Sequence, residues 1–410
     1  MRVAYLTSFY PRVTDVWLQR EVRALRARGV DLHTFTVRST DPAGLLSDAQ
    51  RDEHARTTAI LPSSPITIVR AHAAAVTRGP GRYLRAVRLA LATRTPGLAT
   101  SLKQVAYFVE AGVLAAELRR RRIDHLHNHL SDASCTVAML ASELSGVPFS
   151  FTMHGPSIFY EPEKWRIDEK LRRARYVACI SWFCRSQAAA WVEPEHWEKL
   201  KIVHCGVDVD ELRPSHGSDG TQLLFVGRLT GFKGLPVLLD AMPSIVERRP
   251  GTRLVLVGDG PDREALEAQV RRLGLGDSVE FAGSRSPADV AALLAATDVF
   301  VLPSFAEGVP TVLMEALGAE VPVVTTRIAG VSELVEDGVS GLLVPPSDPS
   351  ALADAVSSLL GDPERRREMG ANGRRVVLEQ FDAAVEASRH LTLLHADDPV
   401  TGTPVRPPSR

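Results

Sequence analysis

The sequence predicts an α/β protein with two open, parallel-sheet lobes. Its 410 residues, 45% of them hydrophobic and 24% charged, correspond to two or three ordinary globular domains. Short apolar segments alternate with amphipathic segments, which is typical of β-α-β units. Residues 1–200 carry 28 Lys and Arg against 19 Asp and Glu, or +9, and residues 201–410 carry 20 against 30, or −10. Two lobes of opposite charge indicate two different ligands.

The composition also excludes several classes of protein. A chain of this length buries a sizeable core, which excludes disulfide-dense, collagen-like and wholly disordered proteins. Four cysteines at positions 135, 179, 184 and 205 lack zinc-finger spacing, so we expect reduced thiols in a cytoplasmic protein. No run of about 18 apolar residues is present, and we expect neither a signal peptide nor a membrane span.

The first lobe is expected at residues 1–205. Residues 3–8 predict a buried strand, residues 15–28 a helix that stops at Gly29, and residues 30–37 a second strand. The alternation resumes further on, with helices expected at residues 108–122, 133–144 and 163–173, and strands at residues 123–127, 149–153, 176–180 and from 201.

Between these parts lies a helical, basic insertion, expected at about residues 45–110. Residues 54–109 contain eight Lys or Arg and no Asp or Glu. They predict either solvated helices or a surface for an anionic membrane or a lipid diphosphate. Nucleic acid is not expected as a partner, because aromatic residues are sparse and no binding motif is present.

The second lobe is expected at residues 206–380. Its strands are predicted at residues 222–226, 254–257, 279–282, 299–302, 321–325 and 342–344, and its helices at residues 234–249, 262–273, 287–295, 310–317, 349–360 and 363–380. We expect residues 381–394 to be helical and to pack back on the first lobe. The Pro-rich tail, residues 395–410, is expected to be disordered.

A first candidate binding motif follows the strand at residues 222–226. Arg228 lies just beyond the strand, and Lys233 lies at the start of the next helix, in a loop with three glycines. Two cations beside free helix-start amides suit a diphosphate. The alternative is a pair of solvated cations on a loop.

A second candidate motif follows the strand at residues 299–302. Glu307 precedes a helix start, and Glu315 lies eight residues later. Between them, a helix N-terminus presents free amides, a ready anion site, in the stretch Gly308, Val309, Pro310, Thr311 and Val312. The alternative is that Glu307 only caps the helix and Glu315 is a surface charge. Because the carboxylates flank the amides, a metal pair is not expected.

These motifs resemble those of a known enzyme family. Glu307 and Glu315 match the EX7E motif of retaining, GT-B fold glycosyltransferases of family 4. Further similarities are Gly227-Arg228, Lys233-Gly234, residues 257–261 and residues 205–208. The resemblance implies two Rossmann-like lobes that face each other across a cleft. Residues 10–15, 19–22, 124–129 and 152–155 resemble the exopolysaccharide subgroup of colanic-acid type, although the first loop lacks the Gly-Gly pair of many members.

The resemblance also implies roles for individual residues. Arg228 and Lys233 would hold the donor diphosphate, Glu307 the sugar hydroxyls and Glu315 the ribose, with His154 acting across the cleft as a further catalytic residue. The base is expected near Gly258 and Arg285. Candidates on the acceptor side are Arg12, Asp15, His127 and His129, although a buried histidine after a strand is often structural.

The function implied is transfer of a hexose from a UDP or GDP sugar to a glycan or lipid-linked acceptor, in bacterial polysaccharide or glycoconjugate synthesis. No cofactor and no metal are expected, because cations and amides can stabilise the leaving diphosphate. No carboxylate nucleophile is evident, which favours same-face attack. Two alternatives remain: a sugar-nucleotide 2-epimerase, and a non-catalytic subunit that binds a nucleotide sugar. We expect a cytoplasmic location with membrane association.

Overall fold

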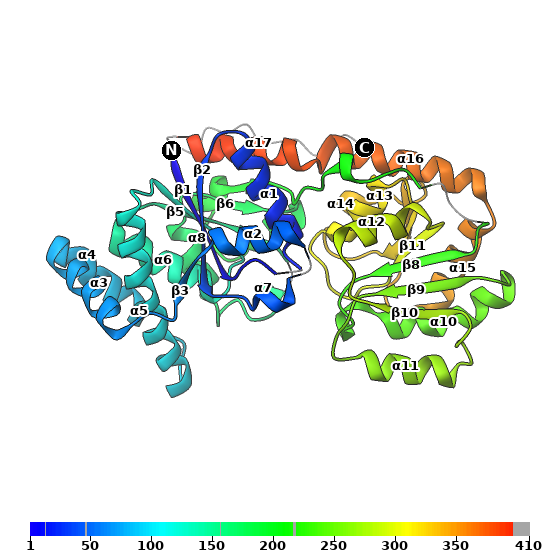
Figure 1. Cartoon of the computed structure of the whole chain (residues 1–410), viewed down its shortest axis with the longest axis horizontal. Coiled ribbons are helices and arrows are strands. Elements are labelled where there is room, and N and C mark those ends of the chain that lie inside the picture. The colour runs from blue at the N-terminus through cyan, green and yellow to red at the C-terminus, as the bar shows by residue number, and fades with distance from the viewer. Residues whose placement is uncertain (13, 46, 156, 216–218, 397–410) are drawn as a thin grey trace. The chain divides into compact units, whose positions relative to one another are not determined.

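The computed structural model describes residues 1–396, apart from residues 13, 46, 156 and 216–218 (Figure 1). The chain forms two compact units, one of Met1–His204 together with the described residues from Ala387, the other of Cys205–Glu386. Each unit contains one all-parallel sheet with helices, which confirms the predicted α/β class. The predicted disordered tail lies, from residue 397 onward, outside the described residues.

The sheet of the first unit has the order β3-β2-β1-β4-β5-β6-β7. Its strands are β1 (Arg2–Phe9), β2 (Asp31–Arg38), β3 (Thr58–Leu61), β4 (His125–His129), β5 (Phe149–Met153), β6 (Val177–Cys179) and β7 (Leu200–Ile202). The order reverses between β1 and β4. Open parallel sheets bind ligands beyond the C-terminal ends of their strands at such a point.

The helices of this unit follow from the spacing of their apolar residues. In α1 (Val16–Ala27), Leu18, Val22 and Leu25 are buried at intervals of four and three residues, so they share the face that covers the sheet. The other helices are α2 (Asp48–Arg56), α3 (Pro65–Arg78), α4 (Pro80–Ala92), α5 (Leu98–Arg120), α6 (Ala133–Ser145), α7 (Ser157–Tyr160), α8 (Ile167–Arg173) and α9 (Trp182–Ala189).

The insertion differs in part from the prediction. Helices α2 to α5 occupy most of it, but Thr58–Leu61 forms strand β3, which pairs in parallel with β2 at the edge of the sheet. Strand β3 has one buried residue, Ile60, and lacks the continuous apolar run that marks a buried strand of the same length such as Val299–Leu302. Helix α5 begins at Leu98 rather than at residue 108, and α8 begins at Ile167 rather than at residue 163.

The second sheet has the order β10-β9-β8-β11-β12-β13, which repeats the reversal of the first. Its strands are β8 (Gln222–Val226), β9 (Arg253–Val257), β10 (Val279–Gly283), β11 (Val299–Leu302), β12 (Val323–Thr326) and β13 (Gly341–Val344). Its helices are α10 (Leu235–Arg248), α11 (Arg263–Arg272), α12 (Pro287–Ala295), α13 (Thr311–Gly318), α14 (Val331–Leu334), α15 (Pro349–Leu360) and α16 (Pro363–Gln380).

The last described helix, α17 (Ala383–His395), begins in the second unit and belongs to the first unit from Ala387 onward. Ala387, Leu393 and Leu394 are part of a hydrophobic core that also includes Val3 and Tyr5 of β1. The C-terminal end of the described chain therefore completes the core around its first strand. None of the described helices has both the length and the apolar character needed to cross a bilayer.

Candidate functional site

In the second unit, the residues predicted to bind the donor follow the two strands at which the sheet order reverses. Gly227 and Arg228 follow β8, and the loop that holds Glu307 follows β11. Glycines allow these loops to approach each other closely. Gly234 has φ +64°, and a Cβ there would lie 1.9 Å from the carbonyl oxygen of Pro303. The loop that carries Lys233 is thereby held against the end of β11.

Lys233 and Glu307 form an ion pair between these two loops. Lys233 Nζ donates to Glu307 Oε1 at 2.5 Å, and Ser304 Oγ donates to the same oxygen at 2.6 Å. The Glu307 side chain is only 10% exposed and that of Lys233 22%. In addition, the Phe305 amide donates to the Phe232 carbonyl at 2.7 Å. A hydroxyl acceptor and a cation thus lie together at the end of the sheet, as binding of a sugar diphosphate requires.

Helix α13 begins directly after this loop. Pro310 stands at its N-cap position, and no side chain caps the helix. The Glu307 carboxylate bonds Lys233 and Ser304, so helix capping does not explain it. Gly308, Val309 and Pro310 are buried, whereas Thr311, Val312 and Glu315 are partly exposed. Partly exposed first-turn residues leave backbone donors for an anion.

The other predicted donor-binding residues lie at the ends of neighbouring strands. Arg228 is exposed beyond β8, and Arg285 is exposed in the loop between β10 and α12. The Gly258 amide, at the end of β9, donates to the Gly283 carbonyl at 2.9 Å. Gly258 has φ +131°, and a Cβ there would lie 2.0 Å from the Gly227 carbonyl oxygen. These loops therefore lie together at the C-terminal ends of the strands of the second sheet.

In the first unit, a pocket of about 490 Å³ lies beyond the C-terminal ends of β1, β2 and β4. Two predicted acceptor-side residues line it: Arg12 Nη2 pairs with Asp15 Oδ1 at 2.9 Å. The remaining polar lining includes Ser8, Arg38, Lys103, Tyr107, Glu110, Asp132 and Ser134.

The pocket lowers the acidity of its carboxyl groups. Burial raises the pKa of Asp15, although Arg12 opposes the shift, and burial likewise raises the pKa of Glu110 against the opposing charge of Arg38. A carboxyl group with a raised pKa is a better proton acceptor than an ordinary one. The lining can therefore bind hydroxyls and anions side by side.

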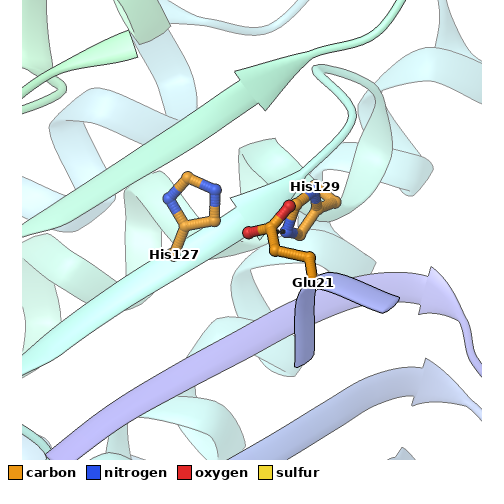
Figure 2. Close-up of side chains that lie close together, drawn as sticks. All are labelled: Glu21, His127 and His129. Carbon is orange, nitrogen blue, oxygen red and sulfur yellow. Dashed lines mark ion pairs between the residues drawn. The ribbon is translucent and has the colours of Figure 1, made fainter. Parts of the chain in front are cut away.

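A cluster of buried histidines lies on one face of β4. His125, His127 and His129 alternate along the strand, so their side chains point the same way. Figure 2 shows Glu21, from α1, reaching toward His127 and His129. Both histidines have no exposed surface, so neither meets solvent in this structure.

His127 is held by hydroxyl groups. Its Nδ1 lies 2.7 Å from Ser150 Oγ, and its Nε2 lies 2.8 Å from Thr152 Oγ1. Burial, followed by the charges of His390 and His129, lowers its pKa well below the usual range. His127 is therefore a neutral side chain that links β4 to β5 through Ser150 and Thr152.

His129 connects Glu21 to His154. Its Nδ1 lies 3.0 Å from His154 Nε2, and its Nε2 lies 3.6 Å from Glu21 Oε1, an ion-pair rather than a hydrogen-bond distance. The ring of Trp17 lies 4.0 Å from that of His154, centroid to centroid. Burial and then His129 lower the pKa of His154. His154 is thus a neutral imidazole at the end of β5 whose orientation depends on His129.

Glu21 also receives donors from outside β4. Tyr5 Oη donates to Glu21 Oε1 at 2.5 Å, and His390 Nδ1, from α17, lies 2.7 Å from the same oxygen. Burial favours the neutral acid, but His129 and His390 outweigh it and hold the pKa of Glu21 well below its usual range.

Donor atoms of Glu21, His127 and His129 all lie within 4.8 Å of one another, a separation that suits a metal ion. However, both nitrogens of His127 already have hydroxyl partners, so a metal ion would have to displace one of them. The donor set as arranged fits a hydrogen-bonded network better than a coordination site.

The sequence analysis included Glu21 only within residues 19–22 and gave it no role. It named neither Tyr5 nor His390 nor the α5 side of the pocket as part of the site. A signal for Glu21 was present: with Leu18, Val22 and Leu25 it lies on the face of α1 that is otherwise apolar. Nothing in the sequence places His390 beside β1, because 385 positions separate it from Tyr5.

Comparison with family models matches both units. Residues 16–211 match the model described as Glycosyltransferase Family 4, and residues 208–376 match that described as Glycosyl transferases group 1. The alpha-D-kanosaminyltransferase of Streptomyces kanamyceticus is 30% identical over 271 residues, which cover 60% of this chain and 70% of the relative.

A GDP-mannose-dependent alpha-(1-6)-phosphatidylinositol monomannoside mannosyltransferase of Mycobacterium tuberculosis is 32% identical over 54% of this chain. The match spans 62% of that relative, which is less than two thirds of its length. Among solved structures, the Anabaena protein Alr3699/HepE in complex with UDP-glucose has a TM-score of 0.73 at 21% identity, with 96% of this chain and 99% of that chain covered. At this identity the similarity concerns the fold.

Proposed function

Because the chain belongs to glycosyltransferase family 4, we propose that it transfers a hexose from a UDP or GDP sugar to a glycan or lipid-linked acceptor. The observation that carries this proposal is the Lys233–Glu307 pair with Ser304 at the end of β11. The comparisons support a nucleotide-sugar donor, since one relative is named for GDP-mannose and one solved neighbour is in complex with UDP-glucose. Bacterial polysaccharide or glycoconjugate synthesis is the process we propose.

In the second unit, Glu307 accepts hydrogen bonds from the sugar hydroxyls, and Lys233 and Arg228 bind the diphosphate. The first-turn amides of α13 add donors to the phosphate, and Glu315 binds the ribose diol. The loops of Gly258 and Arg285 receive the base. On this proposal Lys233 exchanges its contact with Glu307 for the phosphate when the donor binds, which leaves the Glu307 oxygen free for a sugar hydroxyl.

In the first unit, the pocket that contains Arg12 and Asp15 receives the acceptor. His154 contacts the reacting groups. The buried His129 orients His154, and the buried His127 supports the same strand. The bond between the anomeric carbon and the phosphate oxygen breaks, and the acceptor oxygen bonds to that carbon on the same face. The acceptor proton goes to the departing phosphate oxygen, so the products are a glycoside with retained configuration and a nucleoside diphosphate. Lys233 and Arg228 stabilise the growing negative charge without a metal.

The test is a product assay with UDP and GDP sugars and a simple sugar acceptor, with Glu307→Gln and Lys233→Met as variants. We expect both variants to lose at least about 100-fold in rate, because each removes a charged contact with the reacting groups. Asp354→Asn is the matched control, since Asp354 pairs with Arg248 on helices of the same unit. Near-normal rates in either variant, or an epimerised donor as the product, would overturn the proposal.

A further inference from the structure

We propose that helices α3 and α4 and the first half of α5 form a surface that binds an anionic lipid membrane. Figure 1 shows these helices as a blue-to-cyan group at the edge of the first unit. We call residues 65–105 the membrane-facing surface. Membrane binding would give the enzyme access to a lipid-linked acceptor, and this part of the inference rests on the proposed function.

Each of these helices leaves a stripe of large apolar side chains exposed to solvent. On α5, Leu98, Leu102 and Val105 are 88%, 72% and 61% exposed. Their spacing of four and three residues places them on one side of the helix. The other exposed members are Ile66, Val69 and Val76 on α3 and Leu84 and Leu91 on α4, also at helical spacing. Single exposed apolar residues are ordinary, but stripes on three consecutive helices indicate a binding surface.

The charges on the same helices have a single sign. Seven cations of the membrane-facing surface are exposed: Arg70, Arg78, Arg82, Arg85, Arg88, Arg94 and Lys103. Residues 54–109 contain no Asp or Glu. From a neighbouring element, Glu143 of α6 pairs with Arg85. The excess of positive charge is therefore large even after this contact is counted.

Charge complementarity selects the occupant. Two copies of this chain placed face to face would bring their unbalanced cations together, which disfavours a dimer contact. The exposed apolar side chains are aliphatic, whereas Tyr83 and Phe108 are partly buried in a cluster with His72, so no aromatic platform for bases is present. Aliphatic stripes interleaved with arginines match the acyl boundary and headgroups of an anionic bilayer.

Helix α5 connects this surface to the pocket. Lys103, Tyr107 and Glu110 line the 490 Å³ pocket, and the exposed stripe of Leu98, Leu102 and Val105 lies on the same helix. The stripe lies on one side of α5 and the pocket lining on the other, so we propose that a lipid-linked acceptor keeps its chain in the bilayer while its headgroup enters the pocket. The chemistry recognised is an anionic headgroup on an acyl or isoprenoid chain.

The test is cosedimentation of the full chain with phosphatidylcholine vesicles that contain about 30% phosphatidylglycerol, at low salt. We expect the wild type to bind these vesicles, to bind pure phosphatidylcholine weakly, and to lose binding at high salt. The double variants Leu98→Ser/Leu102→Ser and Arg70→Gln/Arg88→Gln should each reduce binding about tenfold or more. All four side chains are exposed, so the fold should tolerate them.

The matched controls are Leu378→Ser, an exposed leucine on α16, and Arg271→Gln/Arg367→Gln, exposed arginines of the second unit. They should bind vesicles as the wild type does. Vesicle binding needs no nucleotide, so its outcome is separate from that of the product assay. Failure of the wild type to bind anionic vesicles, unchanged binding of both test variants, or a lipid-free dimer that Leu98→Ser/Leu102→Ser dissolves would each overturn the proposal.

Discussion

At the residue scale, the partly buried carboxylate of Glu21 holds the histidine cluster together. One oxygen receives Tyr5 and His390 at hydrogen-bond distance and faces His129 at 3.6 Å. A buried charge is stable only when such partners replace its hydration. Because His129 in turn contacts His154, the same carboxylate orients a side chain that we propose to be catalytic.

We therefore expect Glu21→Gln to lower the free energy of unfolding by about 2 to 3 kcal/mol, because it leaves buried partners of the carboxylate without a charge. The measurement is urea unfolding at neutral pH. Glu198→Gln, at an exposed glutamate of the same unit, should change stability by less than about 0.5 kcal/mol. Equal stability of the two variants would show that the cluster does not depend on Glu21.

The histidines also predict how stability changes with pH. Burial lowers the pKa of His125 to about 3, so the unfolded chain takes up a proton below its ordinary pKa of about 6.5 that the folded chain does not. Since the unfolded state binds more protons, stability falls as the pH falls from about 6.5 toward 3. Each such histidine contributes a slope of up to about 1.4 kcal/mol per pH unit.

Urea unfolding at a series of pH values between 7 and 5 measures this slope. His125→Phe should make the slope smaller by about one proton, because that position no longer titrates in the unfolded chain. A variant with the same slope as the wild type would contradict the assignment to His125.

At the element scale, the approach of the two loops in the second unit depends on glycine. Gly234 has a positive φ and lies against the Pro303 carbonyl, whereas a Cβ at Gly231, three residues earlier in the same loop, would meet only Asp262 Oδ2 at 3.8 Å. The two positions thus differ in the space around them although they share one loop.

We expect Gly234→Ala to weaken binding of the donor nucleotide by at least about tenfold, because the loop must move and carries Lys233 with it. Gly231→Ala should bind as the wild type does. Calorimetric titration with UDP and GDP measures both. Normal affinity in the Gly234 variant would show that the close approach does not position the site.

At the scale of the whole molecule, the first unit is completed by a segment from the far end of the chain. Leu394 is 1% exposed and packs in the core with Tyr5, Leu18 and Leu25. The first unit therefore depends on residues that lie far from its first strand in the sequence.

We expect Leu394→Ala to destabilise the first unit by about 2 to 5 kcal/mol, the usual cost of a large-to-small change in a core. Leu378→Ala, at a half-exposed leucine of α16, should cost much less. Thermal unfolding followed by tryptophan fluorescence reports on this unit, because all five tryptophans precede residue 205. Equal melting temperatures for the two variants would contradict the role of α17.

The sequence by itself determined the parts of the protein that depend on neighbouring residues. Short apolar segments that alternate with helical segments predicted every described strand except β3. Gly29 marked the end of one helix, and the proline at position 349 marked the start of another. The motifs around Lys233 and Glu307 lie close together because the C-terminal ends of parallel strands, and the loops that follow them, lie on the same side of the sheet. The edge strand β3 was not predicted, because it buries one residue and has no continuous apolar run, unlike the buried four-residue strand β11.

Only the tertiary structure decided which distant residues share an environment. The meeting of Glu21, His129 and His390 requires α1, β4 and α17 to pack together, and no local pattern records a contact between residues 369 positions apart. The sequence predicted a strand at residues 123–127, which includes His127 but stops short of His129, whereas β4 spans His125–His129. The burial of both side chains arises from the layers that cover β4. Local periodicity follows from backbone geometry, whereas burial, pocket shape and pKa depend on which surfaces the folded chain brings together.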